Sequence, residues 1–152
     1  MSTQTSGMTV RKEIIVACPA EHAFTTFTDG ITSWWPLGRH SVGEARARSV
    51  VFEGRNGGRI YEVWDDGTEC DWGSVLVWQP PQRIVFSWQP NRDRPAPTEV
   101  EVRFLPRGDT TRVELEHRAW ERLGEAAAEA RDGYDSGWDT VLGSYAEVAG
   151  GD

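Results

Sequence analysis

The chain has 152 residues, the size of one ordinary domain. Its net charge of −8, without any basic cluster, argues against nucleic acid and against an anionic membrane surface as partners. Hydrophobic residues make up 38% and charged residues 26%, a balance typical of soluble globular proteins, and no apolar run approaches the roughly 18 residues that would allow membrane insertion.

Eight Trp residues are a large aromatic load, which a small domain has to bury or use. Residues 1–8 are polar and predict a flexible N-terminal tail ahead of a single domain at residues 9–149. The polar start lacks the apolar stretch of a signal peptide, so we expect a cytoplasmic protein. Cys18 and Cys70 do not make a disulfide framework and are expected to be reduced.

The first elements along the chain are a strand and a helix. Residues 10–17 alternate and end in a β-branched run, which predicts a strand. Residues 19–28 begin with Pro and repeat apolar side chains on one helical face, which predicts a helix. A short helical turn over residues 30–35 and a loop over residues 36–47 are expected to follow.

Period-two patterning then predicts about six antiparallel strands, separated by turn signals such as Asp66-Gly67. On the longest of them, simple alternation places Trp72, Ser74, Leu76 and Trp78 on one face. The strands are expected over residues 48–53, 59–64, 69–78, 83–88, 99–105 and 112–118.

Residues 120–149 return to apolar spacings of three and four, which predicts one long amphipathic helix. Gly133 and Gly137 lie inside it, and each costs about 1 kcal/mol relative to Ala, so they indicate a kink or close packing. The long helix is the only predicted element able to cover a sheet with one apolar face. The predicted fold class is therefore α+β: a curved antiparallel sheet wrapped around a long C-terminal helix, with short helices after the first strand.

The sequence carries no motif for metal binding or nucleophilic catalysis. The three His residues lack metal-ligand spacing, and no GxSxG motif is present, so we expect neither a metal nor a cofactor. A carboxylate pointing into a cavity could act as a general base, but alternation places most candidate acids on the solvated outer surface. These acids are Glu53, Glu62, Glu69 and Asp71.

Several motifs in order resemble those of the SRPBCC, or START-like, superfamily, which has the helix-grip fold. The subgroup is that of bacterial proteins similar to the C-terminal domain of the activator of the ninety-kilodalton heat-shock protein ATPase (AHSA-type). The resemblance covers about residues 9–149. It is carried by FTTFTDGITSWWPLGRHSVG, GGRIYEVWDDGTECDWGSVLVWQPPQRIVFSW, TEVEVRF, TRVELEH and the late Gly137-Trp138.

The resemblance implies a cavity between sheet and long helix that binds a hydrophobic, aromatic or lipid-like small molecule. We expect a binding protein rather than an enzyme. The enzyme alternative is a polyketide cyclase or aromatase that uses neither metal nor cofactor. A stress-response protein that interacts with a chaperone is a further alternative, although the chain leaves no residues for the activator's second domain. Another alternative is a self-resistance protein similar to those that sacrifice a backbone glycine to enediyne drugs. The sequence leaves open whether the protein forms a homodimer.

The candidate ligand contacts come from the segment after the first helix, the central strands and the long helix. A Trp row in a sheet is more often core than ligand platform, and a buried His is more often satisfied than reactive. His117 follows Val113 and Leu115 on the predicted inward face and could move protons in the cyclase alternative. The predicted contacts are Trp34, Trp35, His40, Trp72, Trp88, His117, Tyr134 and Trp138.

Overall fold

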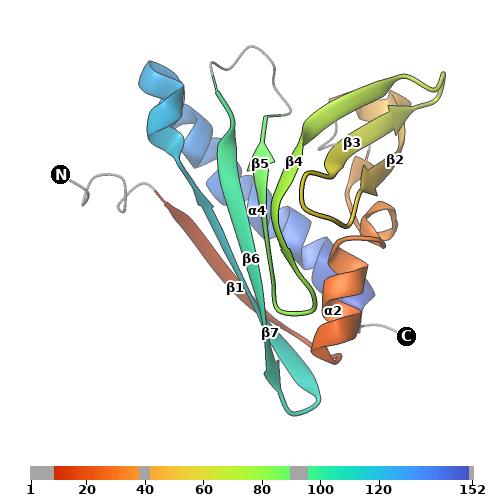
Figure 1. Cartoon of the computed structure of the whole chain (residues 1–152). Coiled ribbons are helices and arrows are strands. Elements are labelled where there is room, and N and C mark those ends of the chain that lie inside the picture. Colours follow the sequence, from red (N-terminus) through yellow and green to blue (C-terminus); the bar gives the residue numbers. More distant parts are fainter. Residues whose placement is uncertain (1–8, 38–41, 90–95, 151–152) are drawn as a thin grey trace.

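The computed structural model describes residues 9–37, 42–89 and 96–150, which form a curled sheet crossed by one long helix (Figure 1). The strands are β1 (Val10–Val16), β2 (Ala47–Phe52), β3 (Arg59–Trp64), β4 (Glu69–Gln79), β5 (Arg83–Trp88), β6 (Thr98–Arg107) and β7 (Thr110–Arg118). The α-helices are α2 (Ala20–Phe27) and α4 (Ala127–Gly150), and the 3-10 segments are η1 (Ile31–Ser33), η2 (Glu44–Arg46) and η3 (Trp120–Ala126).

All neighbouring strands pair antiparallel, in the order β1-β7-β6-β5-β4-β3-β2. The first strand therefore lies against the last, with Val10 opposite His117. α4 runs obliquely across one face of the sheet (Figure 1), and the inward side chains of the strands pack with it into one buried core. The predicted α+β helix-grip architecture is confirmed, and the predicted tail at residues 1–8 lies outside the described residues.

The predicted single helix over residues 120–149 is wrong at its start. Its first turns form the 3-10 segment η3, and Gly124 takes φ 60° and ψ −127°, a conformation that Gly adopts most readily. The α-helix therefore begins only at Ala127. Gly133 and Gly137 lie inside α4, and a Cβ at either would meet nothing within 4 Å, so neither glycine marks close packing.

The prediction that Trp72, Ser74, Leu76 and Trp78 share one face is also wrong. The pairing of β4 shifts register twice, once against β3 beside Trp72 and once against β5 beside Leu76. Each shift inserts an extra residue and reverses the alternation beyond it. Val75 consequently takes a buried position, while Leu76 is 46% exposed.

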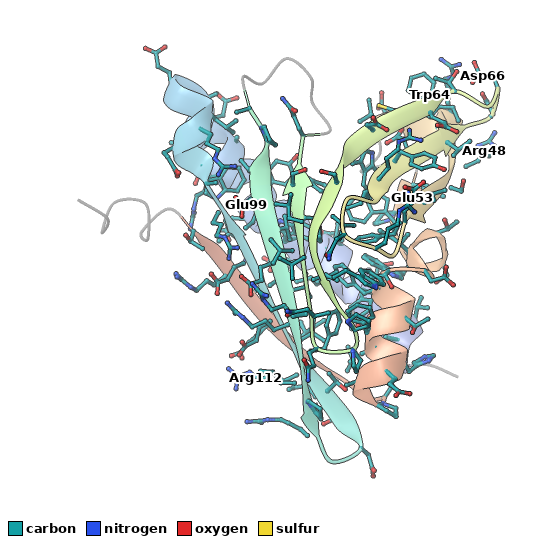
Figure 2. The ribbon with its side chains drawn as sticks, viewed as in Figure 1. Arg48, Glu53, Trp64, Asp66, Glu99 and Arg112 are labelled. Carbon is teal, nitrogen blue, oxygen red and sulfur yellow. The ribbon has the colours of Figure 1, made fainter. Side chains whose placement is uncertain are left out.

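The face of the sheet opposite the core carries ion pairs centred on Glu101. The carboxylate of Glu101 lies 2.7 Å from Arg83, 3.1 Å from Arg103 and 2.6 Å from Arg118. Burial alone would raise the pKa of Glu101, but hydrogen bonds from Arg118 and Arg83 and the charge of Arg103 hold it below its ordinary value. Further ion pairs lie on this face, among them Arg118 with Glu99 and Arg112 with Glu114. Figure 2 labels Glu99 and Arg112.

Candidate functional site

A small cavity lies against α4, and its wall is made mostly of aromatic rings. Its volume is about 60 Å³. Trp35 reaches it from just after η1, Trp72 from β4 and Trp88 from the end of β5, while the remaining wall residues lie on α4. The wall consists of Trp35, Trp72, Trp88, Tyr134, Gly137, Trp138 and Val141.

The aromatic wall residues contact one another in tilted or edge-on pairs. Ring centroids are 4.8 Å apart for Trp35 and Trp72, 5.3 Å for Trp72 and Trp88, and 5.9 Å for Trp88 and Trp138. Such pairs contribute about 0.5–1.5 kcal/mol each beyond the area they bury. The wall is therefore a mutually supported aromatic cage.

The adjacent residues Trp34 and Trp35 take different places. The backbone N–H of Trp35 donates to the carbonyl of Ile31, which brings the Trp35 ring to the cavity. Trp34 turns into the core, where its indole N–H donates to the carbonyl of Thr26 at 2.7 Å and its ring packs on Tyr145. Trp34 is thus a core residue.

Two indoles of the wall bury an N–H group without a partner. Nε1 of Trp35 and Nε1 of Trp88 have no acceptor within residues 9–37, 42–89 and 96–150. Leaving a buried donor unpaired costs about 1–3 kcal/mol. A hydrogen-bond acceptor that reached either N–H group would recover this cost.

His117 lies behind the wall, completely buried, and both of its ring nitrogens have partners. Trp138 donates its indole N–H to Nδ1 at 3.0 Å, so the proton of the neutral ring belongs on Nε2, which lies 2.7 Å from the hydroxyl of Thr98. The Thr98 hydroxyl in turn donates to the carbonyl of Trp88 at 3.2 Å. Burial lowers the pKa of His117 to about 3 and keeps the ring neutral. This chain of hydrogen bonds orients two wall residues, Trp88 and Trp138.

The structure brings five of the predicted contact residues together at the cavity: Trp35, Trp72, Trp88, Tyr134 and Trp138. It places Trp34 in the core and His117 behind the wall, while His40 lies outside the described residues. Sequence reasoning missed Gly137 and Val141 as wall residues. Their spacing of three and seven residues from Tyr134 puts them on the same helical face, which is the signal that could have found them.

Sequence reasoning also missed the role of Glu62. The expectation that the strand acids lie on the outer surface is wrong for this residue, which is completely buried. It shares the inward face of β3 with Ile60, and that alternation was the available signal. Glu69 and Asp71 do lie outside the core, where Arg59 pairs with both at 3.0 and 2.6 Å.

The carboxylate of Glu62 accepts four N–H groups. Oε1 accepts the backbone N–H of Val42 at 2.7 Å and the indole N–H of Trp72 at 2.7 Å. Oε2 accepts the backbone N–H of Gly43 at 2.6 Å and the indole N–H of Trp64 at 2.6 Å. Trp64 lies at the tip of the β3–β4 hairpin beside Asp66 (Figure 2), so Glu62 ties this tip to the cavity wall.

Within residues 9–37, 42–89 and 96–150, no three His, Cys, Asp or Glu side chains gather in a way that could hold a metal ion. None of the helices described is long and apolar enough to cross a membrane.

Comparison with solved structures finds relatives that share the fold. The anthrahydroquino-γ-pyrone synthase Txn09, solved in complex with SUM, is 38% identical, with 92% of this chain and 96% of that chain covered and a TM-score of 0.64. A protein from Mesorhizobium loti is 19% identical, with 91% and 94% covered and a TM-score of 0.69. CalU16 from Micromonospora echinospora is 21% identical, with 95% and 76% covered and a TM-score of 0.61.

No curated protein matches the sequence. The profile of the family described as "Activator of Hsp90 ATPase homolog 1-like protein" matches residues 17–150, which is most of the chain. The match agrees with the helix-grip architecture and confirms the resemblance carried by the sequence motifs. The chain therefore belongs to the family of activator of Hsp90 ATPase homolog 1-like proteins, within the SRPBCC superfamily.

Proposed function

We propose that this protein binds a flat aromatic small molecule in the cavity between β4, β5 and α4. The observation that carries the proposal is the aromatic cage, in which rings from three separate parts of the sheet and its connections face rings from α4. Small-molecule sites are typically concave and apolar, with a few polar groups that fix the orientation of the ligand. Aromatic rings pair with other aromatic rings in offset-stacked or edge-on arrangements, which add about 0.5–1.5 kcal/mol per pair beyond the buried area and so favour an aromatic ligand.

The cavity must widen to admit such a ligand. Its volume of about 60 Å³ is below the roughly 300–1,000 Å³ of ordinary ligand sites. Two wall indoles are held from behind, because the indole N–H of Trp72 is bonded to Glu62 and that of Trp138 to His117. Tyr134 is the half-buried aromatic residue of the wall on α4, and the proposed entrance lies beside its ring.

A second candidate function is ring closure of an aromatic polyketide-type substrate. It is favoured by the 38% identity to the anthrahydroquino-γ-pyrone synthase over nearly the whole of both chains. In this function the aromatic cage would hold the substrate in a folded shape, and the Tyr134 hydroxyl is the titratable group of the wall that could exchange a proton with it. Tyr134→Phe should then retain binding and lose turnover, whereas a protein that only binds should show no turnover before or after the change.

The binding proposal is tested by filling the cavity from α4. Gly137→Leu adds a side chain at the wall, whereas Gly133→Leu adds the same side chain at an exposed position of the same helix. Fluorescence titration with a set of polycyclic aromatic compounds should show quenching of wall Trp residues in the parent protein and in Gly133→Leu. The Gly137→Leu variant should show no such quenching. Equal binding by both variants, or no binding by the parent protein together with no co-purified molecule in native mass spectrometry, would contradict the proposal.

A further inference from the structure

We infer that the ligand carries carbonyl or phenolic oxygens, as quinones and aromatic hydroxyketones do, and that these oxygens accept hydrogen bonds from Nε1 of Trp35 and Nε1 of Trp88. The inference rests on the proposed function, because it names the class of molecule for the same cavity. It is carried by the two buried N–H groups without partners, which belong to residues of the cavity wall.

The other indoles of the chain show that a missing partner is unusual here. Five of them donate to an acceptor inside the protein: Trp34 to Thr26, Trp64 and Trp72 to Glu62, Trp120 to the carbonyl of His117, and Trp138 to the ring of His117. The fold thus supplies acceptors to buried indoles, including two in the same wall. Buried polar groups are nearly always paired, so an unpaired donor in a native interior calls for a specific explanation.

The positions of the two donors give that explanation. Trp35 is 7% and Trp88 6% exposed, their ring centroids are 6.0 Å apart, and both border the cavity. Water reaches such donors poorly, and the neighbouring wall residues Val141 and Gly137 offer no side-chain acceptor. One oxygenated ring system could therefore satisfy both donors, whereas a hydrocarbon or an acyl chain would leave both unpaired.

Neutral N–H donors fit a neutral or weakly basic oxygen. In the part of the wall that the structure describes, no Lys or Arg side chain is present to pair with a carboxylate or phosphate. A carbonyl conjugated with an aromatic ring accepts a hydrogen bond in the plane of the ring, where the indole edges of a surrounding cage can reach it. The chemistry favours a ring-bound ketone or phenol over an anionic lipid.

The experiment compares two ligands that differ in the oxygens. 2-(Hydroxymethyl)anthraquinone and 2-(hydroxymethyl)anthracene have the same three-ring shape and the same neutral substituent, but only the first has ring carbonyls. Affinities are measured by fluorescence titration for the parent protein, Trp35→Phe and Trp88→Phe. Each substitution removes one donor and should weaken binding of the anthraquinone about tenfold more than binding of the anthracene.

Two controls keep the test independent of folding. Trp78→Phe changes a Trp that packs on Phe24 outside the wall and should alter neither affinity. If Trp88→Phe fails to fold, benzothienylalanine at position 88 keeps the ring shape and removes only the N–H group.

The outcomes separate this inference from the proposed function. Equal weakening of both ligands, or none, would overturn the inference and leave an aromatic site without oxygen recognition. Failure of both ligands to bind the parent protein would overturn the inference and the proposed function together.

Discussion

The indole N–H of Trp72, in the cavity wall, donates to the carboxylate of Glu62 at 2.7 Å in the interior of the protein. The two carboxylate oxygens are used symmetrically, since each accepts one indole N–H and one backbone N–H. A single side chain of β3 therefore fixes both the orientation of a wall residue and the path of the backbone at Val42 and Gly43.

Replacing Glu62 with Gln should destabilise the protein strongly. The amide nitrogen of Gln would face two N–H donors in either orientation, so two of the four hydrogen bonds are lost. Hydrogen bonds to a charged group contribute about 1.5–3 kcal/mol each, so the loss of two predicts a decrease of roughly 3–6 kcal/mol in the free energy of unfolding. Urea denaturation of the parent protein and the variant measures this change in the free energy of unfolding. Glu69→Gln, at an exposed ion pair, is the control and should cost less than about 1 kcal/mol; similar losses in the two variants would contradict this account of Glu62.

The burial of His117 should make stability depend on pH. Because its pKa is lowered to about 3 in the folded protein, the unfolded chain binds a proton more readily below about pH 6.5. Between these values stability should fall with decreasing pH by about 1.4 kcal/mol per pH unit from this residue alone. His117→Gln should remove that contribution, which denaturation between pH 7 and pH 5 would detect as a shallower slope. His22→Gln controls for loss of an exposed imidazole on α2, and equal slopes in the two variants would refute the assignment.

The close approach of β4 and β5 at Gly73 should not tolerate a side chain. A Cβ at this position would lie 1.8 Å from the carbonyl oxygen of Ser87, so the strands would have to separate. Gly73→Ala should cost about 3 kcal/mol, the upper end of ordinary overpacking, and lower the melting temperature by roughly 6–12 °C. Gly143→Ala, in α4 with nothing within 4 Å, should instead stabilise the helix by up to about 1 kcal/mol. A melting temperature unchanged by Gly73→Ala would show that the strands are not in contact there.

Glu101 should stabilise the outer face of the sheet above acidic pH. Its folded pKa lies below the ordinary value, so its contribution is present at neutral pH and is lost as the pH falls through the folded pKa. Glu101→Gln should cost roughly 2–3 kcal/mol at pH 7, because it replaces charged hydrogen bonds from Arg83 and Arg118. The deficit should shrink toward pH 3. Glu13→Gln, at a side chain 57% exposed, should cost less than about 1 kcal/mol, and a constant deficit for Glu101→Gln at all pH values would count against the assignment.

Local patterns in the sequence predict most of this fold. The strands at residues 59–64 and 83–88 have the predicted bounds, because alternation and turn residues act over a few positions. The break at Gly124 could not be predicted, because helical spacing continues through residues whose backbone dihedrals depend on packing. The bulges in β4 could not be predicted either, because they are set by the pairing of β4 with two neighbouring strands.

The candidate site could be predicted in composition but not in arrangement. The family resemblance implied a cavity, Trp35, Trp72 and Trp88 were among its predicted contacts, and the structure brings these three side chains together. Which indoles would find acceptors depends on long-range contacts such as Glu62 with Trp72, ten residues apart and on different strands. No local pattern reports such contacts, so the two unpaired donors emerge only from the folded chain.

The indole N–H signals in a ¹H–¹⁵N correlation spectrum test the central claim most directly. Signals are assigned by Trp→Phe substitution, and the spectrum is recorded with increasing 2-(hydroxymethyl)anthraquinone. The account predicts large downfield shifts for Trp35 and Trp88 as their N–H groups gain an oxygen acceptor, while Trp34 and Trp120, bonded to backbone carbonyls, stay in place. Unchanged Trp35 and Trp88 signals in the presence of bound ligand would contradict it.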